Sequence, residues 1–338
     1  MLRAICAYAD AGVIACLLAW RMPPAMPRLN ARIDTKHMHP YGTRLIRRAA
    51  KRMRSIKFIT YSGEPNIAAD DVPLARELEQ RGFDVQACPW DGPERNDSDP
   101  ATFVIRSPWN YDSAPSDFLR WLERLERSGH RLINPQSLIR WNIHKRYLLE
   151  AADRGLAIPQ TALLPRNASE LDGVAAAFSN HEYVVLKPAI SLAAHHTSRV
   201  RSAEILKHVR HLALSERECM IQEYIPEITS GELSFVFFGG RYSHCIRKTP
   251  KTGDFRTQGD FGAVRERYEP TGEEVDRAAH FLALAPERPV FARVDVVRRG
   301  STLLLMELEL IDPMMFFGWV PEASARLAEL IAMQATAS

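Results

Sequence analysis

The chain has 338 residues, of which 46% are hydrophobic and 25% are charged. This composition excludes a collagen, a coiled coil and a wholly disordered chain. The longest apolar run, 13–20, is far shorter than the roughly 20 residues of a membrane-spanning helix. The five cysteines form no CxxC pair, which argues against a structural zinc site or a disulfide framework. We therefore expect a protein of the reducing cytoplasm that has no membrane partner.

Basic residues are concentrated at the start of the chain. Residues 1–52 hold ten Lys and Arg against two acidic residues, which leaves 34 basic and 39 acidic residues in 53–338. A body with this net negative charge is not that of a nucleic-acid binder. The leader, 1–52, fits a targeting peptide, a disordered arm or translated sequence upstream of a true start at Met53. We expect it to carry no chemistry.

Strands and helices alternate from residue 56 onward. The patterns predict strands over 56–61, 83–88 and 102–106, and helices over 71–81 and 117–127. Short strands joined by single helices imply a parallel sheet, whose ligands bind beyond the carboxyl ends of the strands. Arg106, Trp109 and Tyr111 follow such an end, which makes them candidate substrate-binding residues. The alternative is a solvated loop arginine beside packing aromatics.

The sequence of the second half of the chain predicts a different arrangement of helices and strands. We expect two short helices over 137–155 with Lys145 on one of them, strands over 183–188 and 220–226, and hairpins over 233–246 and 290–310. Lys145, and Lys187 at the end of its strand, are candidate phosphate ligands. A solvated surface lysine is the plainer interpretation of either residue taken alone.

Three acidic residues stand in the otherwise apolar strands of the last hairpin. Glu307 and Glu309 are two residues apart and share one face of their strand, and the partner strand can bring Asp295 beside them. Buried carboxylates that converge in this way need a cation to neutralise them. Hard oxygen ligands favour Mg²⁺, with Mn²⁺ as an alternative. An edge strand with its acidic residues turned toward solvent is the competing interpretation.

The order of these features, from about residue 53 to 317, resembles that of ATP-grasp proteins. The likeness is to the prokaryotic glutathione synthetase and ribosomal-protein glutamate ligase branch and to the D-cycloserine-forming cyclo-ligases. The segments that carry it are 106–111, 141–145, 186–189, 222–226, 253–258, 293–295 and 306–313. The resemblance implies an α/β and α+β fold: a parallel-sheet (pre-ATP-grasp) domain over 53–137, and subdomains over 138–223 and 224–330 that clasp the nucleotide.

The resemblance also implies roles for individual residues. Lys145 and Lys187 would bind the α- and β-phosphates of ATP. Asp295, Glu307 and Glu309 would hold magnesium. The remaining implied residues are a hinge that meets the adenine (Gln222, Glu223, Tyr224 and Ile225), a ribose ligand (Glu232) and catalytic cations (Lys248, Arg256 and Arg293).

The implied activity is ATP- and Mg²⁺-dependent ligation of a carboxylate to an amine, between two molecules or within one, through an acyl phosphate. We expect small, amino-acid-like substrates and no nucleic-acid partner, and leave a homodimer open. The loop 189–199 has no glycine, which motivates the alternative of a catalytically degenerate nucleotide-binding protein. Glu309 replaces the usual asparagine, and we expect metal binding to survive this change more surely than the catalytic rate. A peptide- or RNA-binding scaffold has only the basic leader in its favour.

Overall fold

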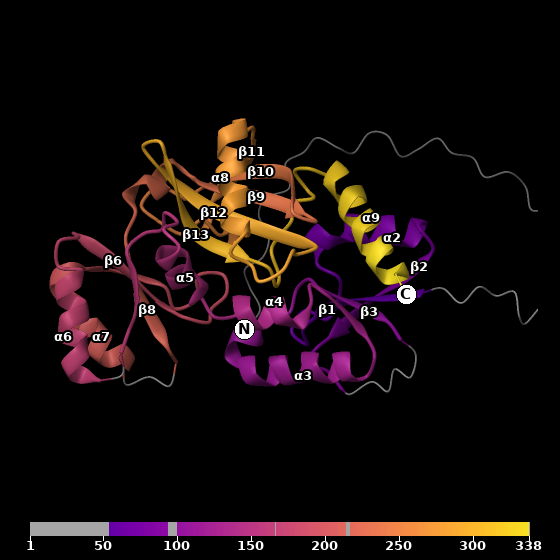
Figure 1. Cartoon of the computed structure of the whole chain (residues 1–338), viewed down its shortest axis with the longest axis horizontal. Helices are drawn as coiled ribbons and strands as arrows, with labels where there is room; N and C mark the ends of the chain where they lie inside the picture. Colours follow the sequence, from indigo (N-terminus) through magenta and orange to yellow (C-terminus); the bar gives the residue numbers. More distant parts are fainter. Residues whose placement is uncertain (1–53, 94–99, 166, 214–216, 338) are drawn as a thin grey trace, which may run out of the picture. The chain divides into compact units, whose positions relative to one another are not determined.

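The structure is a computed structural model that describes residues 54–93, 100–165, 167–213 and 217–337. The chain divides into one unit of residues 1–52 and a second of residues 53–338. The predicted leader lies outside the described residues. The described residues of the second unit form three β-sheets (Figure 1). Among the described helices, none has the length and apolarity that crossing a membrane requires.

The first sheet is parallel, with the order β2-β1-β3-β4, which confirms the predicted strands. Its strands are β1 (Arg54–Thr60), β2 (Phe83–Pro89), β3 (Thr102–Ile105) and β4 (Arg131–Ile133). Because neighbouring side chains on a strand point to opposite faces, Phe58 packs against α2 (Val72–Gln80) and Ile59 against α3 (Pro115–Arg127). Helices therefore cover both faces of this sheet.

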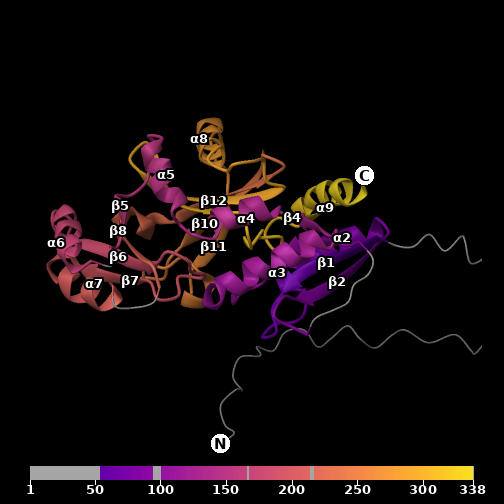
Figure 2. The same cartoon turned by 60° about the horizontal axis from the view of Figure 1, so that its bottom comes forward.

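The C-terminal helix α9 (Glu322–Thr336) returns to this first layer. It lies beside α2 in both views (Figures 1 and 2), and Leu327 and Ile331 share one buried core with Leu74. The boundary expected at residue 330 falls inside this helix. The last segment of the chain thus packs partly on the first sheet, a long-range contact that no local pattern announces.

The second sheet is antiparallel, with the order β5-β8-β6-β7. Its strands are β5 (Thr161–Leu163), β6 (Tyr183–Pro188), β7 (Ser198–Arg201) and β8 (Cys219–Glu223). Helices α6 (Ala168–Ala177) and α7 (Ile205–Ala213) cover one face, and the other carries Lys187 and Gln222. The strand predicted over 220–226 ends at Glu223, because Pro226 opens the 3-10 helix η5 (Pro226–Ser230).

The third sheet has the order β11-β10-β9-β12-β13 and contains both predicted hairpins. Its strands are β9 (Glu232–Phe238), β10 (Arg241–Thr249), β11 (Val264–Tyr268), β12 (Phe291–Arg299) and β13 (Thr302–Glu309). Helix α8 (Gly272–Leu282), which begins with a capping box between Thr271 and Glu274, covers one face through Phe281. The opposite face bears the charged residues of the last hairpin.

Two short helices, α4 (Gln136–Asn142) and α5 (Tyr147–Asp153), form as predicted, but Lys145 lies in the turn between them. This turn is fastened to the free edge of β13. The Asn142 side chain donates to the Leu308 carbonyl oxygen (2.7 Å) and accepts from the Leu310 amide (2.9 Å). The edge strand is thereby covered, and Lys145 is brought to the acidic hairpin. The remaining 3-10 turns are η2 (Ala69–Asp71), η3 (Tyr111–Ser113), η4 (Ser202–Glu204) and η6 (Gly259–Phe261).

Candidate active site

A cleft of about 520 Å³ runs between the second and third sheets, a size typical of small-molecule sites. Its lining contains every predicted nucleotide-binding residue, both predicted glutamate ligands and the three predicted catalytic cations. Trp109 and Tyr111 line it as well. Asp295 lies just beneath the surface of the cleft, 2% exposed, and Arg106 is absent from the lining.

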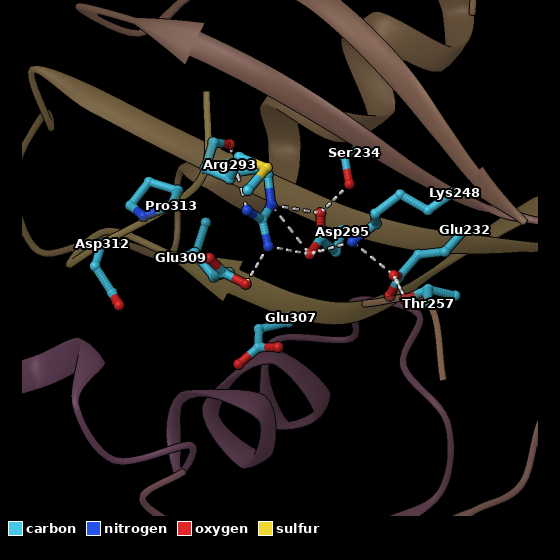
Figure 3. Close-up of polar contacts among 12 residues, drawn as sticks. Glu232, Ser234, Lys248, Thr257, Arg293, Asp295, Glu307, Glu309, Asp312 and Pro313 are labelled. Atoms are coloured by element: carbon cyan, nitrogen blue, oxygen red, sulfur yellow. Dashed lines mark hydrogen bonds and ion pairs between the residues drawn. The ribbon is translucent and has the colours of Figure 1, made fainter. Parts of the chain in front are cut away.

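The three acidic residues of the last hairpin converge as the sequence predicts. Asp295 on β12 is paired in register with Glu307 on β13, and Arg293 with Glu309. One oxygen atom from each carboxylate lies within 4.8 Å of the others (Figure 3). An outward-facing edge strand is therefore ruled out for this hairpin. Three hard oxygen donors at this spacing suit a divalent cation such as Mg²⁺.

Buried cations balance the most deeply buried carboxylate, Asp295. Figure 3 shows its two oxygens surrounded by the side chains of Arg293, Lys248 and Ser234. Arg293 Nη2 lies 3.0 Å and Lys248 Nζ 3.1 Å from one carboxylate oxygen, and Ser234 Oγ donates to the other at 2.6 Å. Burial alone would raise the pKa of Asp295, but the two cations and the hydrogen bonds outweigh it and hold the pKa well below its usual value.

The two glutamates have opposite electrostatic environments. Burial raises the pKa of Glu307, but the charges of Lys145, whose Nζ lies 3.1 Å away, and of Lys187 outweigh it and lower the pKa. At Glu309 burial and the neighbouring carboxylates outweigh the paired Arg293 and raise the pKa to about 8. The site thus holds a carboxyl group whose charge its own cations do not fully stabilise. A divalent cation would favour the ionised form of Glu309, so these residues fit a metal.

The side-chain amide of Gln222 holds the Lys187 ammonium group in the cleft. Lys187 Nζ donates to Gln222 Oε1 (3.0 Å), while Gln222 Nε2 donates to Thr161 Oγ1 (2.9 Å), which sets the orientation of the amide. Burial lowers the pKa of Lys187 to about 8, with Glu307 acting in the opposite direction. A lysine in this environment gains from the arrival of an anionic ligand, which would favour its charged form.

The loop that follows Lys187 lines the cleft although it has no glycine. Lys145 Nζ donates to the Ser191 carbonyl oxygen (2.9 Å) and so fixes the start of the loop. Ala193, Ala194 and His196 adopt left-handed conformations with φ of 47°, 57° and 56°. These conformations are ones that glycine adopts without steric cost. The backbone path is therefore reached with alanine and histidine in place of glycine.

The predicted adenine hinge follows β8. Two of its backbone amides are already engaged: Glu223 N–H donates to the Gln160 carbonyl oxygen (2.8 Å) and Tyr224 N–H to that of Tyr183 (3.3 Å). The Glu223 carboxylate pairs with Arg299 (2.7 Å) on β12, which joins the second sheet to the third. Other backbone groups of this segment would have to meet the adenine.

Two further predicted residues are held by local partners. Glu232, the implied ribose ligand, lines the cleft and forms a buried ion pair with Lys248 (2.7 Å). Arg256 lies in the loop after β10, where it pairs with Asp254 (2.8 Å) and its guanidinium lies 3.6 Å from the centroid of the Phe261 ring. Arg256 therefore enters the cleft from a loop rather than from a sheet.

The environment of Arg106 differs from the one that the sequence suggests. Its side chain is 2% exposed, pairs with Asp71 (2.8 Å) and donates to the Pro313 carbonyl oxygen (3.0 Å). It joins the first sheet to the segment after β13. Arg106 Nη1 has no hydrogen-bond partner in the described part of the chain, and Arg106 is not among the residues that line the cleft. Its contact with substrate stays a prediction. Of the three predicted substrate-binding residues, Trp109 and Tyr111 line the cleft.

Sequence reasoning missed three charged residues in the lining, Glu64, Asp312 and Arg265. Tyr111 OH donates to Asp312 at 3.5 Å, and burial raises the pKa of Asp312 to about 7. Arg265 lies 5.5 Å from the centroid of the Trp319 ring. Asp312 stands in the recognised 306–313 segment and could have been found there. Arg265, on β11, lies in none of the segments that carry the family resemblance.

Two sheets that enclose a cleft with paired lysines and a carboxylate triad define the ATP-grasp class of protein. Residues 155–314 match the family model for the prokaryotic glutathione synthetase ATP-grasp domain, and residues 56–134 match that for the D-cycloserine synthetase DcsG N-terminal domain. The chain belongs to the ATP-grasp family and is an ATP-dependent ligase that forms C–N bonds.

Individual relatives agree with this assignment. The chain is 30% identical to the cycloserine biosynthesis protein DcsG of Streptomyces lavendulae over 78% of its own length and 93% of that protein. A crystal structure of D-cycloserine synthetase DcsG matches with a TM-score of 0.74 and 25% identity, covering 83% of this chain and 100% of that one. D-alanine–D-alanine ligase from Bacillus anthracis shares the fold, with a TM-score of 0.59 and 16% identity over 84% and 97% of the two chains.

Proposed function

We propose that the protein joins a small, amino-acid-like carboxylate to an amine, between two molecules or within one, and releases ADP and phosphate. One observation carries the proposal. The carboxylates of Asp295, Glu307 and Glu309 come together opposite the two lysines of a single cleft. Such an arrangement suits a metal-bound polyphosphate, because it supplies donors for the metal and cations for the phosphates.

Lys145 and Lys187 are the proposed ligands of the ATP phosphates. Lys145 pairs with Glu307 and Lys187 donates to a neutral amide, so a phosphate would give Lys187 an anionic partner and Lys145 a second one. The hinge over 222–225 would hold the adenine, and Glu232 would meet the ribose. All of these residues are among those that line the cleft, which supports the proposal.

The carboxylate triad is the proposed site of magnesium, with Mn²⁺ as the alternative. When bound, the metal offsets the charge that gathers on the transferred phosphoryl oxygens. Arg293 and Lys248 are already engaged with Asp295, so we propose that they hold the triad in place and add positive charge beneath it. Arg256 reaches the cleft from a loop and would face the transferred phosphate.

The chemistry follows from the weakness of a carboxylate as an electrophile. Transfer of the terminal phosphoryl group of ATP to a substrate carboxylate oxygen gives an acyl phosphate and ADP. The amine nitrogen then attacks the acyl carbon, the bond to phosphate breaks, and the nitrogen loses a proton. This route requires no nucleophile from the protein, and the role of the cleft is to position the reactants and stabilise charge.

The substrate would lie against Trp109 and Tyr111, near Asp312. The aromatic rings offer an apolar wall, and the carboxylate offers a partner for an ammonium group. These features support an amino-acid-like substrate. A relative named D-cycloserine synthetase and family matches to glutathione synthetase support small-molecule ligation without deciding between cyclisation and joining two molecules.

The full-length chain tests the proposal when it is incubated with ATP, Mg²⁺ and pools of amino acids while ADP and phosphate are measured. Substrate-dependent phosphate release that Glu307→Gln loses is the expected result. If ATP binds but no pool raises phosphate release above that of the variant, the catalytically degenerate alternative holds. If ATP does not bind, both the proposed ligase activity and the catalytically degenerate alternative are contradicted.

A further inference from the structure

Three aromatic rings from three separate segments surround one arginine on β7. The Arg199 guanidinium carbon lies 5.0 Å from the ring centroids of Tyr183 and of Tyr224, and 5.8 Å from that of Phe255. Tyr224 also meets each of the other two rings edge to face. A guanidinium at such distances is attracted to the face of each ring. We call Tyr183, Tyr224 and Phe255 the aromatic cage.

Each ring of the aromatic cage belongs to a segment that serves the site. Tyr183 begins β6, the strand that carries Lys187. Tyr224 belongs to the predicted adenine hinge, and Phe255 directly precedes Arg256 in the chain. Tyr224 and Phe255 both line the cleft, whereas Arg199 is not among the lining residues. The arginine therefore contacts two residues of the cleft lining, Tyr224 and Phe255, through their rings.

We propose that Arg199 is a positioning residue for nucleotide binding. It fixes the Tyr224 and Phe255 rings at the nucleotide end of the cleft, and through Phe255 it ties the Arg256 loop to the second sheet. Arg199 also ends the glycine-free loop 189–199, so one side chain links that loop, the hinge and the Arg256 loop. This inference rests on the proposed function, because it takes the hinge end of the cleft to hold the nucleotide.

The chain supplies a matched control on the same strand. Arg201 is two residues further along β7 and contacts one ring only, Tyr183, at 5.4 Å. Both arginines are exposed, so neither substitution is expected to damage the core. Replacement of either by methionine removes the charge and keeps an extended apolar side chain. The two variants thus differ in whether the contacts to Tyr224 and Phe255 are lost.

The first experiment measures the dissociation constant of MgADP for the full-length wild type, Arg199→Met, Arg199→Lys and Arg201→Met. Loss of three cation–π contacts is expected to weaken MgADP binding about tenfold in Arg199→Met. Arg199→Lys keeps a cation and recovers part of the loss, and Arg201→Met binds within twofold of wild type. The inference is overturned if Arg199→Met binds like Arg201→Met, or if lysine gives no recovery.

A double-variant cycle tests whether Arg199 acts through the rings. If it does, Arg199→Met adds little to the loss already caused by Phe255→Leu. Fully additive losses would mean that Arg199 acts by another route and would overturn the inference. Thermal unfolding of each variant checks that the fold is kept. Wild-type protein that fails to bind MgADP would contradict the proposed function itself, whereas normal binding by Arg199→Met removes only this inference.

Discussion

Arg293 on β12 lies directly opposite Glu309 on β13, and its guanidinium binds both Glu309 and Asp295. The asparagine that the family resemblance leads one to expect at position 309 would bring no charge. Arg293 balances part of the charge that the glutamate adds, and the pKa of the Glu309 carboxyl nevertheless stays raised, to about 8. The site therefore keeps the geometry of a metal triad with a third carboxyl group, whose ionised form a bound divalent cation would favour.

Removal of that charge gives a direct test of Glu309 as a metal ligand. Because affinity for hard cations depends on the charge of the ligands, we expect Glu309→Asn to raise the half-saturating Mg²⁺ concentration about tenfold. Titration of ATP-dependent turnover with Mg²⁺ measures the effect. Asp276→Asn removes the same charge from an exposed position on α8 and should leave the titration unchanged. An unaltered Mg²⁺ requirement in Glu309→Asn would remove Glu309 from the ligand set.

Because the pKa of Lys187 is lowered, we predict that nucleotide affinity depends on pH. Burial holds the pKa of Lys187 at about 8, so the nucleotide-free protein carries the charge at pH 7 and loses it as the pH rises through 8. Phosphate requires the charged form, and we expect the dissociation constant of MgADP to rise by up to about tenfold per pH unit above 8. Calorimetric titrations between pH 6.5 and 9.5 measure it.

The control for this pH effect is a variant that cannot titrate. Lys187→Gln should bind MgADP more weakly at pH 7 and show a flatter profile above pH 8. Lys207→Gln, at an exposed position on α7, should retain the wild-type profile. A wild-type profile that is flat through pH 9, or a Lys187→Gln profile as steep as that of wild type, would separate Lys187 from the phosphates.

The sequence predicted most of the strands and the acidic hairpin because both depend on short apolar runs and local residue spacing. Glu307 and Glu309 share a face by strand geometry alone, and a tight hairpin limits where Asp295 can lie. The lysines were found as candidates by their position in chain order, but the Lys145 turn is held by Asn142 against an edge strand more than 160 residues away. No local pattern encodes such a contact.

Arg106 shows the opposite limit of sequence reasoning. Its place at the end of a parallel strand was predicted, but the pairing with Asp71 could not be, because it depends on how the segment before α2 packs beneath the strand ends. A strand end brings a side chain to the edge of the sheet without deciding whether it faces ligand or protein. In the structure Arg106 is held by protein groups, Asp71 and the Pro313 carbonyl oxygen.

This structural role of Arg106 leads to a third prediction. Arg106→Met leaves the Asp71 carboxylate buried and unpaired, which should lower the free energy of unfolding by about 3–5 kcal/mol in urea titrations. Arg76→Met, at an exposed position on α2, should change it little. The double variant Asp71→Asn, Arg106→Met should lose less than Arg106→Met alone. A stable Arg106→Met protein with a raised KM for its substrate would favour the substrate-binding interpretation.

The glycine-free loop gives the last prediction, which concerns backbone strain. Ala194 has a φ of 57°, in a region where a β-carbon is crowded by the neighbouring carbonyl oxygen. Ala194→Gly removes that crowding, and the relief should outweigh the greater chain entropy of glycine in the unfolded state. We expect the free energy of unfolding to rise by about 0.5–1 kcal/mol in urea titrations.

The same substitution within a helix should lower the free energy of unfolding instead of raising it. Ala175 lies within α6, and Ala175→Gly should cost about 1 kcal/mol because a helical alanine is not strained. The contrast isolates the backbone conformation, since the two substitutions remove the same methyl group. A loss of stability in Ala194→Gly equal to that in Ala175→Gly would mean that the loop does not hold Ala194 in a left-handed conformation. A gain would show that this loop follows a path suited to glycine at a measurable cost in stability.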